Sequence, residues 1–330
     1  MNDFTPNPFK LNPKSAFGKT PTKSSKTPTA IWAVGGGKGG IGKSFISTSI
    51  AICLTRMGKS VTLVDLDLGS ANLHTCLGMK IPSQTLSDFF SGRATNLSEV
   101  STATEIPGLH FISGFNDALN VADLDPNNKQ RLIEGLRTLQ TQYVILDLGA
   151  GTSENTLDFF LAADQKIIAV TPEPTSIENA YRFMKSSFYR KLRTAESELG
   201  IQGLIETAMD SKNKLGIKSP ADLIRYISQK DPQVGERLKE KIGDFHMHLL
   251  LNQVRTREDI ELGESMKSVC RKYFGIESDF LGYIDHDNAV WQSLRKRRPL
   301  VIEYPYSSIV GQFLGITKNL LNPTPLRAVI

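Results

Sequence analysis

The stretch Gly35–Ser44 reads GGGKGGIGKS and is the most informative part of the sequence. It follows a short apolar run, Ala30–Gly35, and precedes a helical pattern that extends to Met57. From Gly37 onward it satisfies G-x-x-x-x-G-K-S, the phosphate-binding loop of nucleoside triphosphatases. Because a strand, a glycine-rich loop and a helix follow one another in this order, the sequence predicts a nucleotide site at this loop.

Each residue type in the loop suits phosphate binding. Glycines allow backbone N–H groups to turn toward phosphate oxygens, and the N-terminus of the following helix adds its dipole. We expect Lys43 to bridge the β- and γ-phosphates and Ser44 to bind Mg²⁺. The predicted nucleotide contacts are Gly37, Lys38, Gly39, Gly40, Ile41, Gly42, Lys43, Ser44 and Phe45.

Lys38 stands at a position that the loop motif leaves open. This second lysine of the loop is therefore either incidental or has a role of its own. The three aspartates described next favour a role.

Three aspartates follow predicted strands at the edge where ligands bind in parallel sheets. Asp65 ends the run Val61–Asp65, and Asp147 lies near the end of Tyr143–Leu148 before a glycine-rich turn. We expect Asp65 and Asp147, with Ser44, to hold Mg²⁺ or its water ligands. Asp67 is close enough in sequence to orient an attacking water. The alternative for Asp147 is a plain strand-end cap.

From residue 30 onward, short apolar runs alternate with helical patterns, which is typical of an α/β fold with a doubly wound, mostly parallel sheet. The expected strands are Ala30–Gly35, Val61–Asp65, Leu109–Ser113, Tyr143–Leu148, Lys166–Thr171, Met247–Gln253 and Phe280–Ile284. The 75 residues between Thr171 and Met247 exceed a normal crossover. We therefore expect a long helix, Ile177–Leu199, followed by a helical insertion at about residues 202–244.

These motifs resemble those of the MinD/ParA family of P-loop ATPases. KGGIGKS is similar to the family's deviant Walker A loop, DLDLGSAN to its switch I and LDLGAG to its switch II. Gly149–Lys185 is especially similar to the FlhG/FleN branch, which regulates flagellar number and placement. The resemblance covers residues 30–185 strongly and 246–321 more weakly.

The resemblance implies an ATP-dependent homodimer with ATP or ADP and Mg²⁺ as its ligands. Lys38 matches the lysine that reaches across the dimer to the partner's nucleotide, much as an arginine finger does. Asp67 matches the water-positioning residue. Asn252 matches the asparagine that reads adenine, and Asp285 lies where the family contacts adenine or ribose. A strand-end asparagine is also a common turn residue.

The net charge of +5 is unevenly distributed. Residues 1–30 carry five lysines against Asp3, and this segment is rich in Pro, Ser and Thr. We expect a disordered basic tail at 1–29, an ATPase domain at 30–322 and a short C-terminal tail at 323–330. The three cysteines, Cys53, Cys76 and Cys270, are widely spaced and form no metal motif, which fits a reducing cytoplasm.

The predicted function is a MinD/FlhG-like ATPase, a Mg-dependent and partner-stimulated dimerisation switch that controls the number or placement of a cellular structure. Its protein partners would bind the switch regions or the insertion, and the protein would be cytoplasmic with recruitment to a membrane or cell pole. A ParA-type DNA-partitioning ATPase is the alternative, because Arg295–Arg298 (RKRR) could contact phosphates. An iron–sulfur carrier and a non-catalytic scaffold are further rivals. The stripe at Tyr306–Leu321 predicts a core-packing helix rather than a membrane helix.

Overall fold

The computed structural model describes residues 28–67, 72–114, 124–201, 203, 205–206, 215–217, 219–243, 245–275 and 278–322. The predicted basic tail up to residue 27, part of the predicted insertion and the segment 323–330 therefore lie outside the described residues.

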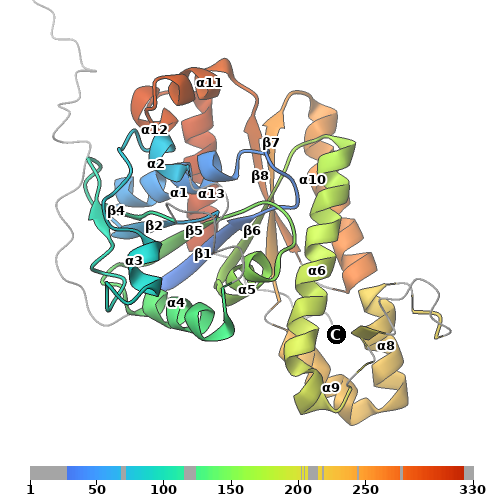
Figure 1. The fold of residues 1–330 in the computed structure, drawn as a ribbon. Coiled ribbons are helices and arrows are strands. Elements are labelled where there is room, and N and C mark those ends of the chain that lie inside the picture. Colours follow the sequence, from blue (N-terminus) through green and yellow to red (C-terminus); the bar gives the residue numbers. More distant parts are fainter. Residues whose placement is uncertain are drawn as a thin grey trace, which may run out of the picture.

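Within the described residues, eight strands form one sheet in the order β3-β4-β2-β5-β1-β6-β7-β8 (Figure 1). The strands are β1 Ala30–Gly35, β2 Val61–Leu66, β3 Thr102–Ala103, β4 Leu109–Ile112, β5 Tyr143–Leu148, β6 Gln165–Val170, β7 Met247–Val254 and β8 Ser278–Asp285. Every pair is parallel except β3 with β4. The predicted doubly wound, mostly parallel sheet is confirmed.

Helices cover both faces of the sheet (Figure 1). One face carries α1 Lys43–Arg56, α2 Leu73–Cys76, α12 Leu300–Glu303 and α13 Ser308–Leu321. The other carries α3 Leu86–Phe90, α4 Pro126–Thr138, α5 Glu154–Ala162, α6 Pro174–Leu199 and α10 Arg257–Val269 with its π-helical end Cys270–Phe274. Helix α11, Asn288–Arg295, follows β8.

The central strands are apolar on both sides because both faces are covered. In β1, Ile31 and Ala33 belong to one core cluster, and Trp32 and Val34 to the other. This alternation explains why the strands read as continuous apolar runs in the sequence.

Helix α6 is much longer than the strand that precedes it. Its 26 residues extend about 39 Å, whereas the six residues of β6 extend about 20 Å. Helix α6 therefore continues past the amino edge of the sheet, where α8 (Pro220–Lys230) and α9 (Pro232–Ile242) pack against it (Figure 1).

The two insertion helices begin where the sequence predicts. Ser219 and Asp222 form a capping box at the start of α8, and Pro220 is its first residue. Asp231 caps α9 by accepting from two backbone N–H groups.

Helix α13 packs in the core through one face, as expected, with Ile309, Val310, Phe313, Ile316 and Leu320 buried. Among the helices of the described residues, none has both the length and the apolar character needed to cross a membrane.

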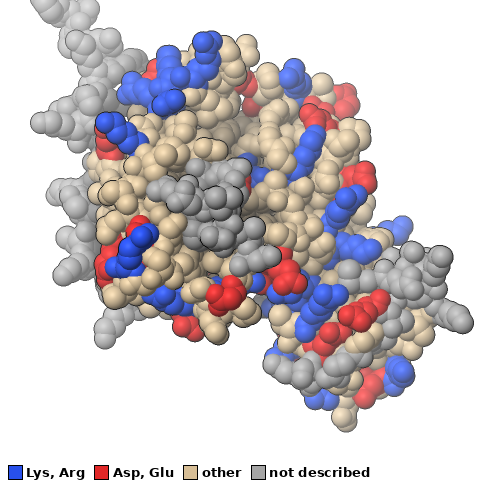
Figure 2. Space-filling model, in the orientation of Figure 1, with Lys and Arg blue, Asp and Glu red and all other residues tan. Residues whose placement is uncertain are grey.

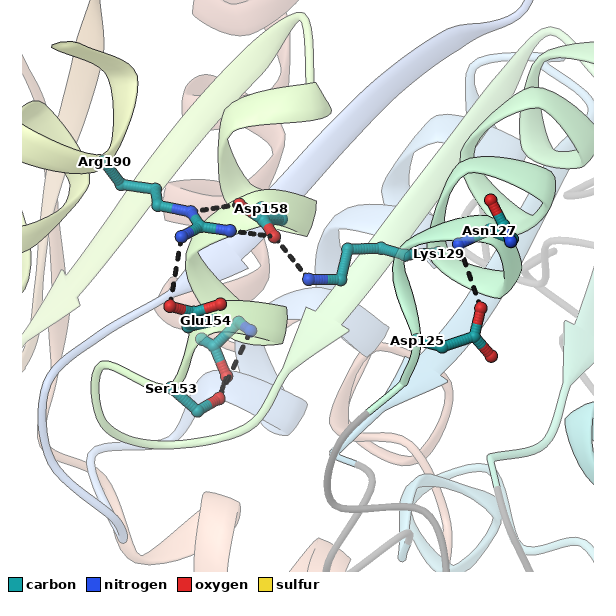
Figure 3. A network of polar contacts seen from close by, with 8 residues as sticks. Asp125, Asn127, Lys129, Ser153, Glu154, Asp158 and Arg190 are labelled. Carbon is teal, nitrogen blue, oxygen red and sulfur yellow. Dashed lines mark hydrogen bonds and ion pairs between the residues drawn. The ribbon is translucent and has the colours of Figure 1, made fainter. Parts of the chain in front are cut away.

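A polar network fastens α6 to the helices beside it (Figure 3). Arg190 of α6 pairs with Asp158 at 2.8 Å and with Glu154 at 3.1 Å, both on α5. Lys129 of α4 binds the same Asp158. Burial alone would raise the pKa of Asp158, but hydrogen bonds from Arg190 and Lys129 hold this pKa below its ordinary value. The charged carboxylate therefore stabilises the junction of three helices.

We expect Asp158→Asn to lower the free energy of unfolding by about 1–3 kcal/mol at neutral pH, because the partly buried Lys129 and Arg190 lose this charged partner, although Arg190 keeps Glu154. The folded pKa of Asp158 lies below its unfolded value. Its contribution is therefore present above about pH 4 and is lost as the pH falls through the folded value. Urea unfolding of both proteins at several pH values measures this difference.

The matched control is Glu178→Gln, which removes an exposed ion pair with Arg182 and should change stability by less than about 0.5 kcal/mol. An equal loss in both variants, or a difference that does not depend on pH, contradicts the assignment.

Candidate functional site

The predicted site residues meet at the carboxyl edge of the sheet. The loop from Gly36 to Gly42 joins β1 to α1 and lies between the ends of β5, β6 and β7. Asp65 and Asp147 are register partners on the neighbouring strands β2 and β5. Residues as far apart in the chain as Ile41 and Asn252, 211 positions, are brought into one small region.

The glycine-rich loop lies directly against α6 and β7. A Cβ atom at Gly37 would come 2.1 Å from the backbone oxygen of Asn179 on α6. Gly42 has a φ of +91°, and a Cβ there would come 2.3 Å from the amide nitrogen of Asn252 on β7. Only glycine satisfies both constraints, which explains these two glycines by packing as well as by phosphate access.

Lys43 is buried at the start of α1, and its ammonium lies 3.4 Å from the backbone oxygen of Lys38. Burial lowers its pKa, while the negative charges of Asp147 and Asp67 act in the opposite direction. A buried ammonium that points back into its own loop is suited to neutralise a bound anion.

Two buried carboxylates, Asp65 and Asp147, lie side by side at this edge of the sheet, and Asp147 acts on the charge of Lys43. Asp65 accepts hydrogen bonds from the backbone N–H groups of Asp67 and Leu73, at 3.1 and 3.0 Å. Asp147 accepts one from the Ser47 hydroxyl at 2.9 Å and another from Ser44.

Burial raises the pKa of Asp65 to about 8, and the neighbouring Asp147 adds to the effect. Burial also raises the pKa of Asp147 to about 6, although Ser44, Ser47 and Lys43 oppose the shift. Two acidic side chains that disfavour each other's charge gain stability from a cation between them. Asp65, Asp147 and Ser44 therefore fit Mg²⁺ in donor type and in charge.

Asp67 leaves β2 toward the turn after β5. A Cβ atom at Gly149 would come 3.1 Å from its carboxylate oxygen, so the side chain reaches the segment that resembles switch II. Leu68 to Ala71, which belong to the predicted switch I, lie outside the described residues.

Lys38 lies at the outer side of the loop, where its side chain is 37% exposed. Its ammonium forms an ion pair with Glu173 at 2.9 Å and a hydrogen bond with Thr175 at 3.0 Å, both near the start of α6. The two loop lysines thus point to different places, Lys43 inward and Lys38 toward the surface.

The predicted adenine contacts have partners within the chain. The amide of Asn252 donates to the loop oxygen of Ile41 at 2.8 Å. Asp285 ends β8, and its carboxylate accepts from Gln312 of α13 at 2.7 Å. The ring of Phe45 packs edge-on against Phe313 in the core. The structure therefore assigns Asn252 a direct role in holding the loop.

The partners that hold these residues were not predicted from the sequence. Ser47, which binds Asp147, lies one helical turn after the loop motif, and this spacing is the one local clue to it. Glu173, Thr175 and Asn179 contact the loop from more than 130 positions away. They follow the end of β6, the edge at which ligand-contacting residues are expected in such sheets.

The loop, the buried lysine and the paired aspartates define a P-loop nucleoside triphosphatase. A profile of the family described as "CobQ/CobB/MinD/ParA nucleotide binding domain" matches residues 32–300. The chain belongs to this family, as the sequence motifs indicated.

Two curated relatives support the resemblance to the FlhG/FleN branch. The antiactivator FleN of Pseudomonas aeruginosa is 32% identical over 163 residues, 49% of this chain. The flagellum site-determining protein YlxH of Helicobacter pylori is 34% identical over 177 residues, 53% of this chain. The chain spans 57% of the length of each of these relatives.

Solved structures match the fold over most of the chain. The septum site-determining protein MinD of Pyrococcus horikoshii, complexed with Mg-ADP, has a TM-score of 0.62 at 21% identity and covers 92% of this chain and 100% of its own. The MinC:MinD complex of Aquifex aeolicus gives a TM-score of 0.61 at 16% identity, over 91% of this chain and 98% of the matched one.

We expect Gly37→Ala to destabilise the protein by about 1–3 kcal/mol, because the added methyl group must displace the backbone of α6. Gly39→Ala is the matched control, since a Cβ atom there meets nothing within 4 Å. Urea unfolding of the two variants measures the difference. Equal stability would show that the loop does not depend on this contact.

Proposed function

We propose that this protein is a Mg-dependent ATPase that acts as an ATP-driven dimerisation switch. The proposal rests on the different positions of the two loop lysines. Lys43 is buried beside Asp147, whereas Lys38 lies at the surface of the same loop. A single subunit needs one lysine for its own phosphates, so the outer lysine is free to serve a second subunit.

ATP supplies the transferable phosphoryl group, and Mg²⁺ neutralises charge on its oxygens, when both are bound. Lys43 and the backbone N–H groups of the loop would hold the phosphates, and Ser44, Asp65 and Asp147 would hold the metal ion. Asp67 would orient the attacking water from its place beside Gly149. Asn252 would keep the loop in place through Ile41.

Lys38 must leave Glu173 and Thr175 to reach a second subunit. The ion pair is exposed, with Glu173 59% accessible, and pairs of this kind contribute about 0–1 kcal/mol. The contact is therefore weak enough for the nucleotide of a partner subunit to replace it. In the monomer this ion pair would hold Lys38 near the proposed dimer face without fixing it there.

The similarity to FleN and YlxH supports a role in setting the number or placement of flagella. Protein partners would engage the switch regions or the insertion helices α8 and α9. The expected location is the cytoplasm, with recruitment to a membrane or cell pole in the ATP state.

Lys and Arg side chains gather over α11 and α12 (Figure 2). Arg295 stacks on Trp291, which is 59% exposed. Glu303, however, pairs with both Lys296 and Arg298. An aromatic ring with partly neutralised cations fits a membrane interface better than a row of DNA phosphates. This difference favours the membrane-associated switch over the ParA-type alternative.

We expect Lys38→Ala to keep ATP binding but to lose ATP-dependent dimerisation and turnover. Lys43→Ala should lose ATP binding itself, because the buried charge that faces the phosphates is removed. Equilibrium nucleotide binding, analytical ultracentrifugation and phosphate release measure the three properties. If Lys38→Ala hydrolyses ATP at the normal rate and still dimerises, the proposed role of Lys38 in the partner's site is wrong.

Glu173→Gln should strengthen ATP-dependent dimerisation by roughly two- to five-fold, because it weakens the ion pair that competes for Lys38. The control is Glu178→Gln, which changes an exposed carboxylate on the same helix that pairs with Arg182. Dimer dissociation constants from ultracentrifugation distinguish the two variants, and equal constants would exclude competition by Glu173.

The binding surface is tested by sedimentation with anionic liposomes in ATP and in ADP, using Asp67→Ala to hold the ATP state. ATP-dependent pelleting is the expected result. A parallel experiment with double-stranded DNA tests the alternative, and ATP-dependent binding to DNA without binding to liposomes would overturn the membrane assignment.

A further inference from the structure

A second group of metal-ligating side chains lies at the amino edge of the sheet, opposite the nucleotide site. His246 precedes β7, His248 lies within it, and Asp279 lies near the start of β8. One ligand atom from each of the three residues lies within 4.8 Å of the other two. The proposed ATPase activity uses none of them.

Strand register brings the three side chains together. His248 and Asp279 are register partners on the parallel strands β7 and β8, so their side chains point to the same face. His246 is two residues before His248 and therefore shares that face. Both imidazoles approach the same carboxylate oxygen, Oδ2 of Asp279, with His246 Nε2 at 2.9 Å and His248 Nδ1 at 3.8 Å.

The hydrogen bond of His248 to Gln165 fixes which nitrogen carries its proton. Nε2 of His248 lies 2.5 Å from the amide oxygen of Gln165, and that oxygen can only accept. Nε2 is therefore the donor in neutral His248, and Nδ1 keeps its lone pair. His248 is 2% exposed, and its Nδ1 is buried without a hydrogen-bond partner among the residues that the structure describes.

A buried lone pair and a carboxylate oxygen therefore face each other across 3.8 Å. Two acceptors at this distance repel each other, and a cation bound by both would remove the repulsion. We propose that His246, His248 and Asp279 bind a divalent transition-metal ion of the Zn²⁺ type. Two imidazoles and one carboxylate are a recurrent ligand set for such ions, and Gln165 acts as the outer partner that orients His248.

The geometry requires small adjustments for binding. Ligand atoms in a tetrahedral zinc site lie about 2.0–2.2 Å from the ion and so about 3.3 Å from one another. Rotations of the side chains are enough to reach this spacing from the present distances. Asp279 is 39% exposed, which gives the ion a path from solvent and leaves a position for water. Lys166 points to the opposite face, because it alternates with Gln165 along β6.

The site would join the start of β8 to the residues that enter β7. β8 is the edge strand of the sheet, and His246 follows directly after the insertion helices return to β7. A bound ion would cross-link the chain at the end of the insertion to the edge strand. Its expected effect is metal-dependent stability of this corner.

The test is Zn²⁺ binding to the full chain, measured by competition with a chromogenic chelator. Mg-ADP is present in excess so that the nucleotide site does not contribute. We expect one equivalent of Zn²⁺ per chain and a rise in melting temperature with added Zn²⁺. His248→Gln and Asp279→Asn should each weaken the affinity at least tenfold and remove the rise. Gln165→Leu should weaken it about tenfold through the orientation of His248.

His110→Gln is the matched control, because His110 is an exposed histidine on β4, at the other side of the sheet. Asp279 is partly exposed, so Asp279→Asn tests the site even if His248→Gln fails to fold. Co²⁺ in place of Zn²⁺ gives a visible absorption spectrum that reports nitrogen and oxygen ligands. The proposal is overturned if binding is absent, or if it is the same in the Asp279→Asn and His110→Gln proteins.

Discussion

The candidate nucleotide site depends on one constraint, the close packing of the glycine-rich loop against α6 and β7. Gly37 touches the backbone of α6, and Gly42 touches Asn252 of β7. Both elements are held by the apolar core, since Phe183 and Met184 of α6 and Leu249 of β7 are buried in one cluster. The position of the loop is therefore set by core packing, which supports a preformed site.

The buried charges at the site, unlike the apolar core packing, destabilise the fold. Two register-paired carboxylates are buried at the ends of β2 and β5, and each has a raised pKa. Lys43 and two serine hydroxyls offset this cost in part. A sheet with both faces covered can carry such a site because its apolar burial greatly exceeds the local cost. The same unfavourable charge would favour the binding of Mg²⁺ in the proposed function.

The sequence predicted the features of the fold that depend on local residue patterns. The strands were visible because β1, β5 and β6 are buried on both faces, and Ser219 and Asp231 marked the helix starts of the insertion. Strand β3 was not predicted because its two residues are too few to show an alternation of apolar and polar side chains. Contacts between distant segments were not predictable: the pairing of Lys38 with Glu173 depends on how α6 leaves β6, and the bond from Asn252 to Ile41 depends on strand order.

Helix α6 connects the two ends of the molecule. Near its start, Glu173 and Thr175 hold Lys38, and Asn179 touches Gly37. In its middle, Arg190 is fastened to α5, which begins just after the turn that resembles switch II. Its far end packs against the insertion helices beyond the amino edge. One helix therefore contacts both the glycine-rich loop and the insertion helices, although these lie at opposite edges of the sheet.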